Sequence, residues 1–233
     1  MSKASYKIVK NEDRLFFHDG KRYVLLDTGF INPLTETYSI SDDGMIGPFK
    51  VSRPPFDFLD NFINLTMDDG SKPRAVLNPL DGFNCLLEED TITITDEDIE
   101  CPPGKWFLEF TDPKLSVVDG SINGKKVRFF FDTGARMTMI GEAPQGSEPH
   151  RTYREWLGQL RKHADLPVYN VSLEFPCGFQ YQGEAALVTH DIYRTAARMM
   201  KIQAILGIDL FKHYDLFISA GGSRRGLTLI ERK

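Results

Sequence analysis

Among the 233 residues of this sequence, two aspartates are the strongest candidates for chemically active groups. Asp27 and Asp132 each begin an Asp-Thr-Gly tripeptide that directly follows a largely apolar run, at 23–26 and 127–131. A short apolar run rich in β-branched and aromatic residues predicts a buried strand. Because carboxylates are rarely buried without a partner, we expect the two aspartates to be partners of each other. Carboxylates about 3 Å apart share one proton, so the pair could supply a general base and a general acid.

The surroundings of the two tripeptides also match. Each strand is preceded by an Asp-Gly or Asn-Gly turn signal of a tight hairpin, and each tripeptide is followed by an apolar segment and a further strand-like stretch. The matched segments are 19–22 with 123–126, 75–83 with 204–211, and 90–94 with 226–230. The sequence therefore predicts an internal duplication of about one hundred residues per copy, which means two lobes of one fold rather than a solenoid.

Composition excludes several classes of protein. The formal net charge of −5 argues against a nucleic-acid or anionic-membrane partner. No apolar run approaches the ~20 residues that span a bilayer, and the first residues lack the apolar stretch of a signal peptide. Cys85, Cys101 and Cys177 form neither a disulfide framework nor a zinc site. We therefore expect a cytoplasmic protein with reduced, buried thiols.

Apolar alternation and turn signals predict strands along most of the chain. We expect strands near 6–9, 15–17, 23–26, 76–83, 91–94, 106–110 and 115–118, and hairpins at 38–51 and 168–188. The acidic and then Pro/Gly-rich stretch 96–104 predicts a linker between lobes 1–95 and 105–233.

Three segments predict short helices among these strands. Residues 56–59 suit a single turn, and residues 189–200 suit a short helix. At 152–163 an amphipathic helix is expected, because Tyr153, Trp156 and Leu160 have helical spacing. This helix is an insertion that makes the second copy longer than the first, and its apolar residues are expected to pack in the core.

An apolar strand, Asp-Thr-Gly, a glycine-containing flap hairpin and a later apolar-apolar-Gly segment together resemble the retropepsin-like aspartic proteases. In retroviral proteases one copy forms one subunit, whereas here both copies lie in one chain, as in pepsin-like enzymes. The resemblance covers about 15–230. It implies an all-β, two-lobed acid-protease fold with a few short helices, a monomer, an extended peptide as substrate, and no metal or other cofactor.

The same resemblance implies roles for individual residues. Asp27 and Asp132 would be catalytic. Four residues would support the active-site loops, namely Thr28, Gly29, Thr133 and Gly134. The hairpin 38–51 lies where the family's flap follows the first tripeptide, so four of its residues are predicted to bind substrate, namely Gly44, Met45, Ile46 and Gly47. The segment 205–207 would pack beneath the second catalytic loop.

The sequence departs from the family in three places. Asn78 stands where the first copy should have glycine, which predicts a reshaped turn under Asp27. Phe30 follows the first tripeptide where Ala or Ser is usual, and it could narrow the cleft or shift the pKa of Asp27. The second copy carries the helical insertion in place of a glycine-rich flap.

These departures leave an alternative function open. The chain could be a catalytically weak or inactive peptide-binding scaffold that retains the fold. In that interpretation the two Asp-Thr-Gly turns are structural, and 38–51 is an ordinary surface hairpin.

Overall fold

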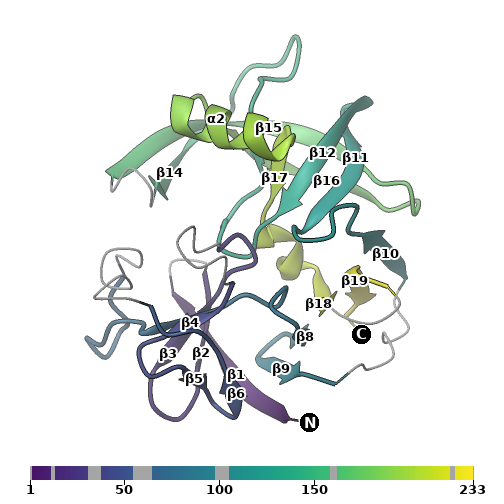
Figure 1. Cartoon of the computed structure of the whole chain (residues 1–233). Helices are drawn as coiled ribbons and strands as arrows, with labels where there is room; N and C mark the ends of the chain where they lie inside the picture. The colour runs from purple at the N-terminus through teal and green to yellow at the C-terminus, as the bar shows by residue number, and fades with distance from the viewer. Residues whose placement is uncertain are drawn as a thin grey trace.

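The computed structural model describes residues 2–11, 14–30, 38–54, 65–97, 105–157, 162–220 and 224–232. As predicted, this part of the chain is mostly β-structure (Figure 1). Its helices are α2 (Asp191–Met200) and the 3₁₀ helix η2 (Ile208–Lys212). None of the helices in the described ranges is long and apolar enough to cross a membrane.

The larger sheet contains strands from both ends of the chain, in the order β10-β19-β18-β8-β9-β1-β2-β3-β7-β4. Its strands are β1 (Lys3–Asn11), β2 (Arg14–His18), β3 (Tyr23–Leu26), β4 (Ile40–Ser41), β7 (Ala75–Leu77), β8 (Asn84–Glu88), β9 (Thr91–Thr95), β10 (Trp106–Glu109), β18 (Tyr214–Ser219) and β19 (Gly226–Glu231). The antiparallel β8–β18 pair joins the two halves of the chain, with Cys85 opposite Ile218. Outwards from this pair, β9 and then β1 on one side match β19 and then β10 on the other.

The second sheet belongs to the second half of the chain and has the order β11-β12-β17-β13-β16-β15-β14. Its strands are β11 (Val117–Ile122), β12 (Lys125–Phe131), β13 (Met139–Ile140), β14 (Arg151–Leu157), β15 (Lys162–Glu174), β16 (Gln180–Leu187) and β17 (Ala204–Leu206). The small pair β5 (Met45–Ile46) and β6 (Phe49–Lys50) stands apart from both larger sheets.

Both tripeptides follow strands that have neighbours on each side. β3 lies between β2 and β7, and β7 runs parallel to β3 but antiparallel to β4. In the same way β12 lies between β11 and β17, and β17 runs parallel to β12 but antiparallel to β13. The two halves of the chain therefore deliver Asp27 and Asp132 through the same strand pairing.

The ends of these two strands that lead into the tripeptides are apolar because both of their faces are buried there. Val24 and Leu26 lie in the main core, whereas Leu25, between them, lies in a second cluster on the opposite face. Phe129 likewise lies in the main core, and Phe130 packs in a separate cluster. A strand that is covered on both faces reads as a continuous apolar run rather than an alternating one.

The prediction of an amphipathic helix at 152–163 is wrong, because β14 and β15 form an antiparallel pair there. Thr152 and Arg154 are exposed whereas Glu155 is buried, which is the period of a strand. A pattern of apolar residues does not reveal this period, because the inward-facing residue is a charged glutamate. The second half of the chain therefore carries a hairpin after its tripeptide. The tip, 158–161, lies outside the described residues.

Other expected elements have mixed outcomes. The short helix at 189–200 is confirmed by α2, and the hairpin at 168–188 is confirmed by β15 and β16. The helical turn at 56–59 lies outside the described residues, as does most of the linker at 96–104. Among the thiols, Cys85 is buried, but Cys177 is exposed, contrary to expectation.

The β8–β18 junction gives a test of the fold. Ile218 is fully buried opposite Cys85, so Ile218→Ala should lower the free energy of unfolding by about 2–5 kcal/mol. Met199 on α2 is 79% exposed, and Met199→Ala should change it by less than about 0.5 kcal/mol. Urea unfolding of both variants measures the difference, and equal stabilities would contradict the buried junction.

Candidate active site

Two threonines join the tripeptides through reciprocal hydrogen bonds. The Thr28 N–H donates to Thr133 Oγ1 at 3.0 Å, and the Thr133 N–H donates to Thr28 Oγ1 at 2.9 Å. Each hydroxyl in turn donates to the carbonyl before the opposite aspartate, Thr28 to Phe131 O at 2.9 Å and Thr133 to Leu26 O at 3.1 Å. Both threonines are fully buried. The structure therefore brings Asp27 and Asp132 together, as predicted from the repeated motif.

Each aspartate is also fixed by its own half of the chain. The Asp27 N–H donates to Leu77 O at 3.0 Å, and the Asp132 N–H donates to Leu206 O at 2.9 Å. The carboxyl of each accepts the N–H two residues later, from Gly29 or from Gly134, at 2.8 Å in both cases. The carboxyls consequently point across the junction between the two tripeptides.

Gly29 and Gly134 are required by the close approach of the two loops. A Cβ at Gly134 would lie 2.7 Å from the carboxyl carbon of Asp27. A Cβ at Gly29 would overlap the carboxyl of Asp132 in the same way. Each glycine therefore packs directly against the opposite carboxyl, and no other residue type fits without moving it.

Burial and mutual proximity set the protonation of the two carboxyls. Burial raises the pKa of Asp27 well above its ordinary value, and the charge of Asp132 and a hydrogen bond between the carboxyls raise it further. Burial also raises the pKa of Asp132, but the Gly134 N–H, the hydrogen bond with Asp27 and the Arg14 guanidinium oppose the rise. Because burial and mutual proximity disfavour two ionised carboxyls, the pair shares one proton and carries a single negative charge.

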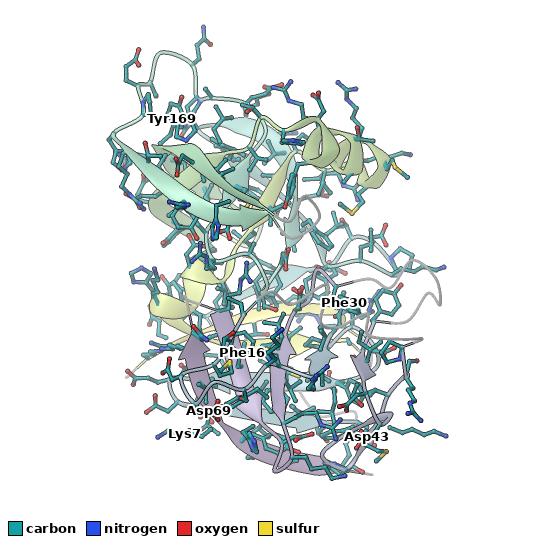
Figure 2. All side chains as sticks on the ribbon, turned by 90° about the vertical axis from the view of Figure 1, so that its left-hand side faces the viewer. Lys7, Phe16, Phe30, Asp43, Asp69 and Tyr169 are labelled. Carbon is teal, nitrogen blue, oxygen red and sulfur yellow. The ribbon has the colours of Figure 1, made fainter. Side chains whose placement is uncertain are left out.

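Asn78 explains the first departure from the family pattern. Its side-chain amide donates to Thr28 O at 3.1 Å and to Phe30 O at 2.9 Å, and its side-chain oxygen accepts the Leu80 N–H at 2.9 Å. The amide thus supports the first Asp-Thr-Gly loop from beneath. Phe30 is 2% exposed and packs in the cluster that contains Phe16, so its ring does not line an open cleft (Figure 2).

The second loop is supported by a different device. Gly207 has no room for a side chain, since a Cβ would lie 2.5 Å from the backbone of Met137. Its N–H donates to the Thr138 hydroxyl at 3.3 Å, which donates to Asp209 at 3.1 Å. Burial raises the pKa of Asp209 to about 6. Sequence reasoning missed Asp209, although a carboxylate inside the apolar segment 204–211 is a signal that could have identified it.

The predicted substrate-binding residues Gly44, Met45, Ile46 and Gly47 are not at this site. Ile46 is fully buried in the main core, and the Gly47 N–H donates to Asp19 at 3.3 Å. Asp19 belongs to the turn before β3, at the end of that strand opposite to Asp27. In Figure 2 the neighbouring Asp43 lies well away from Phe30, which follows the first tripeptide.

The prediction of a flap at 38–51 is therefore wrong. Ile46 and Phe49 bury their side chains in the core, and Arg22 pairs with Asp43 at 2.5 Å. These contacts hold the segment against the outer end of the sheet.

Comparisons with protein-family models and with curated proteins found no match to this chain. Within the described ranges, no group of three or more histidine, cysteine, aspartate or glutamate side chains is placed to hold a metal ion. A cavity of about 500 Å³ lies elsewhere, beside the β11–β12 hairpin and Phe175.

The threonine hydroxyls can be tested individually. Thr133→Val keeps the shape of the side chain but leaves the buried Thr28 N–H without its acceptor, so the free energy of unfolding should fall by about 1–3 kcal/mol. Thr133→Ser keeps the hydroxyl and should lose no more than about 1 kcal/mol. Chemical denaturation compares the two variants. A serine variant as unstable as the valine variant would show that the methyl group, not the hydroxyl, matters.

Proposed function

We propose that the chain is an aspartic endopeptidase of the retropepsin-like type, and that a water activated between Asp27 and Asp132 hydrolyses the peptide bond. The reciprocal Thr28–Thr133 hydrogen bonds carry this proposal. They hold two Asp-Thr-Gly loops face to face with their carboxyls in hydrogen-bonding contact. A structural turn would need neither the second tripeptide nor a shared proton.

The strand pairing supports the accompanying proposal of a duplicated, two-lobed acid-protease fold. The arrangement of β3, β7 and β4 matches that of β12, β17 and β13. The larger sheet repeats the match, since β1, β9 and β8 correspond to β10, β19 and β18. Each lobe then supplies one aspartate, and a single chain supplies a complete site.

We assign the shared proton to Asp27, whose pKa is raised more than that of Asp132, and this assignment gives each carboxyl its own role. Ionised Asp132 accepts a proton from the water, whose oxygen forms a bond to the carbonyl carbon of the substrate. Asp27 donates its proton to the carbonyl oxygen, which gives a neutral gem-diol. Asp27, now ionised, takes a diol proton as the C–N bond breaks, and Asp132 returns its proton to the leaving nitrogen. No covalent intermediate forms, and the pair ends with one shared proton on Asp27.

An extended peptide is the substrate that suits the surrounding sheet. β14 is the last strand in the order of the second sheet, and its Glu155 pairs with Arg14 and with Arg136, which follows the second tripeptide. A peptide lying along an edge strand gains main-chain hydrogen bonds that do not depend on its sequence. The hairpin β14–β15 thus takes the flap role that was predicted for 38–51.

One observation favours the alternative of a non-hydrolytic peptide-binding scaffold. Asp27 is only 7% exposed, so a water must enter a largely closed site. Asp132 is partly exposed, which supports the enzyme. Repeated cleavage of a peptide distinguishes the endopeptidase from the scaffold, which would bind the peptide without cleaving it.

Replacing either aspartate should abolish cleavage. Asp27→Asn removes the acid and Asp132→Asn removes the base, so each should lower the cleavage rate of a mixed peptide library at least about a thousandfold, with no further loss in the double variant. Asp90→Asn, the same change on an exposed turn, is the control and should retain full activity. Near-full activity in either site variant would remove the two-carboxyl mechanism.

The cleavage rate should be bell-shaped against pH. Protonation of Asp132 removes the base, and burial places its pKa above the ordinary value of 3.8, so the acid limb lies above that pH. Loss of the Asp27 proton removes the acid, and its strongly raised pKa moves the alkaline limb toward neutrality. We expect a weakly acidic optimum with residual activity near neutral pH. Rates on one peptide, with Asp132→Asn as blank, test this, and a flat profile would favour the scaffold.

A further inference from the structure

Arg14 begins β2, the strand beside the one that leads into Asp27. The register of β2 against β3, continued by two residues, sets Arg14 level with Asp27. Its side chain is only 11% exposed. The same continuation of β11 against β12 sets Leu115 level with Asp132. The cation at this position therefore comes from the first half of the chain alone, and its charge opposes the rise in the pKa of both aspartates.

Glu155 from β14 is the counter-ion of Arg14. The Arg14 Nη2 lies 3.4 Å from Glu155 Oε1, and the Arg136 Nε lies 3.3 Å from Glu155 Oε2. The Tyr153 hydroxyl also donates to Glu155 Oε2, at 2.8 Å. Arg136 follows Asp132 by four residues, so this buried glutamate joins the β14–β15 hairpin to residues from both halves of the site.

The charges of this cluster balance for one protonation state of the aspartates. Arg14 and Arg136 contribute two positive charges, Glu155 contributes one negative charge, and the carboxyl pair contributes one more when it shares a single proton. Loss of that proton leaves the buried cluster with an uncompensated negative charge, and uptake of a second leaves a positive one. Uncompensated buried charge is strongly unfavourable, so the cluster favours the singly protonated pair.

Two other titratable groups lie near the pair, namely Asp209, which supports the second tripeptide loop through Thr138, and Tyr193. Burial raises the pKa of Asp209 to about 6, so it changes charge in the weakly acidic range and its titration is followed separately from that of the pair. Tyr193 of α2 packs against the cluster that contains Ala135, the residue after the second tripeptide. Burial, together with the charges of Glu155 and Asp132, raises the pKa of Tyr193 to about 12, so it is neutral throughout the working range. Tyr153 meets Glu155 as a hydrogen-bond donor.

We propose that Arg14, with Glu155 as its counter-ion, is a positioning residue that maintains the singly protonated carboxyl pair and links its proton affinity electrostatically to the β14–β15 hairpin. The part of this proposal that concerns catalysis rests on the proposed function. The hairpin that frames the substrate also carries the negative charge that offsets Arg14. A change in hairpin position would therefore alter how strongly the pair holds its proton.

Two substitutions should move the titration of the pair in opposite directions. Arg14→Met removes the cation that stabilises ionised carboxyls, so both titration steps should move to higher pH by about one unit. Glu155→Gln removes the anion that neutralises the two arginines, so both steps should move to lower pH. Arg14→Lys keeps the charge and should restore most of the wild-type titration. If Arg14 and Glu155 had a purely structural role, both variants would be less stable, but the titrations of their carboxyl pairs would not shift in opposite directions.

The readout is the ¹³C chemical shift of the aspartate carboxyl carbons against pH, assigned by their loss in Asp27→Asn and Asp132→Asn. Lys105→Met and Glu231→Gln make the same changes in net charge on an exposed ion pair, and they should leave the titration unchanged because solvent screens that pair. The titration does not require turnover. A wild-type protein without cleavage would thus remove the proposed function and still leave this proposal measurable.

Opposite shifts in the two variants, with unmoved controls, would support the proposal. Shifts of the same sign, or none, in folded variants would overturn it. Should Arg14→Met not fold, Glu155→Gln must still titrate at lower pH and Arg14→Lys must match the wild type. An upward or absent shift in Glu155→Gln is then sufficient to reject the role of Arg14.

Discussion

The crossed threonine hydroxyls are the contact on which the site depends. Each hydroxyl accepts the N–H of the opposite threonine and donates to a carbonyl of the opposite strand, so neither loop can move alone. A shift of either loop would leave buried donors unpaired, at about 1–3 kcal/mol for each group. The distance between the two carboxyls is consequently set by backbone geometry, and the rest of the fold delivers those two backbones to the same place.

Holding two carboxyls in a buried space creates an electrostatic cost that the protein has to offset. Neutral hydrogen-bond donors contribute part of the compensation, through the N–H groups of Gly29 and Gly134. Buried ion pairs seldom add net stability compared with well-packed apolar residues. A cluster of Arg14, Glu155 and Arg136 beside the aspartates is therefore better explained by a requirement on their protonation than by folding.

The sequence predicts the parts of this structure that depend on local pattern. Strands buried on both faces appear as apolar runs, and the repeated tripeptide predicts that Asp27 and Asp132 meet. The errors arise where the structure depends on the direction in which a side chain points, which the sequence pattern does not show. Glu155 points inward, which hides the strand period of β14, and Ile46 buries itself in the core, which removes 44–47 from the site. The role of Asn78 depends on two carbonyls that only the folded loop brings within reach.

A duplicated fold by itself would give two equivalent aspartates, whereas the proposed hydrolysis needs one acid and one base. The difference must therefore come from positions at which the two copies diverge. Asn78 supports the first loop with a side-chain amide where Gly207 leaves only a backbone N–H, and Arg14 occupies the position that Leu115 holds in the second copy. These departures from the repeat make the surroundings of the two aspartates unequal, although the charge of Arg14 acts on both of them. Under the proposed function, residues at the positions where the two copies differ are the ones that can make one carboxyl the acid and the other the base.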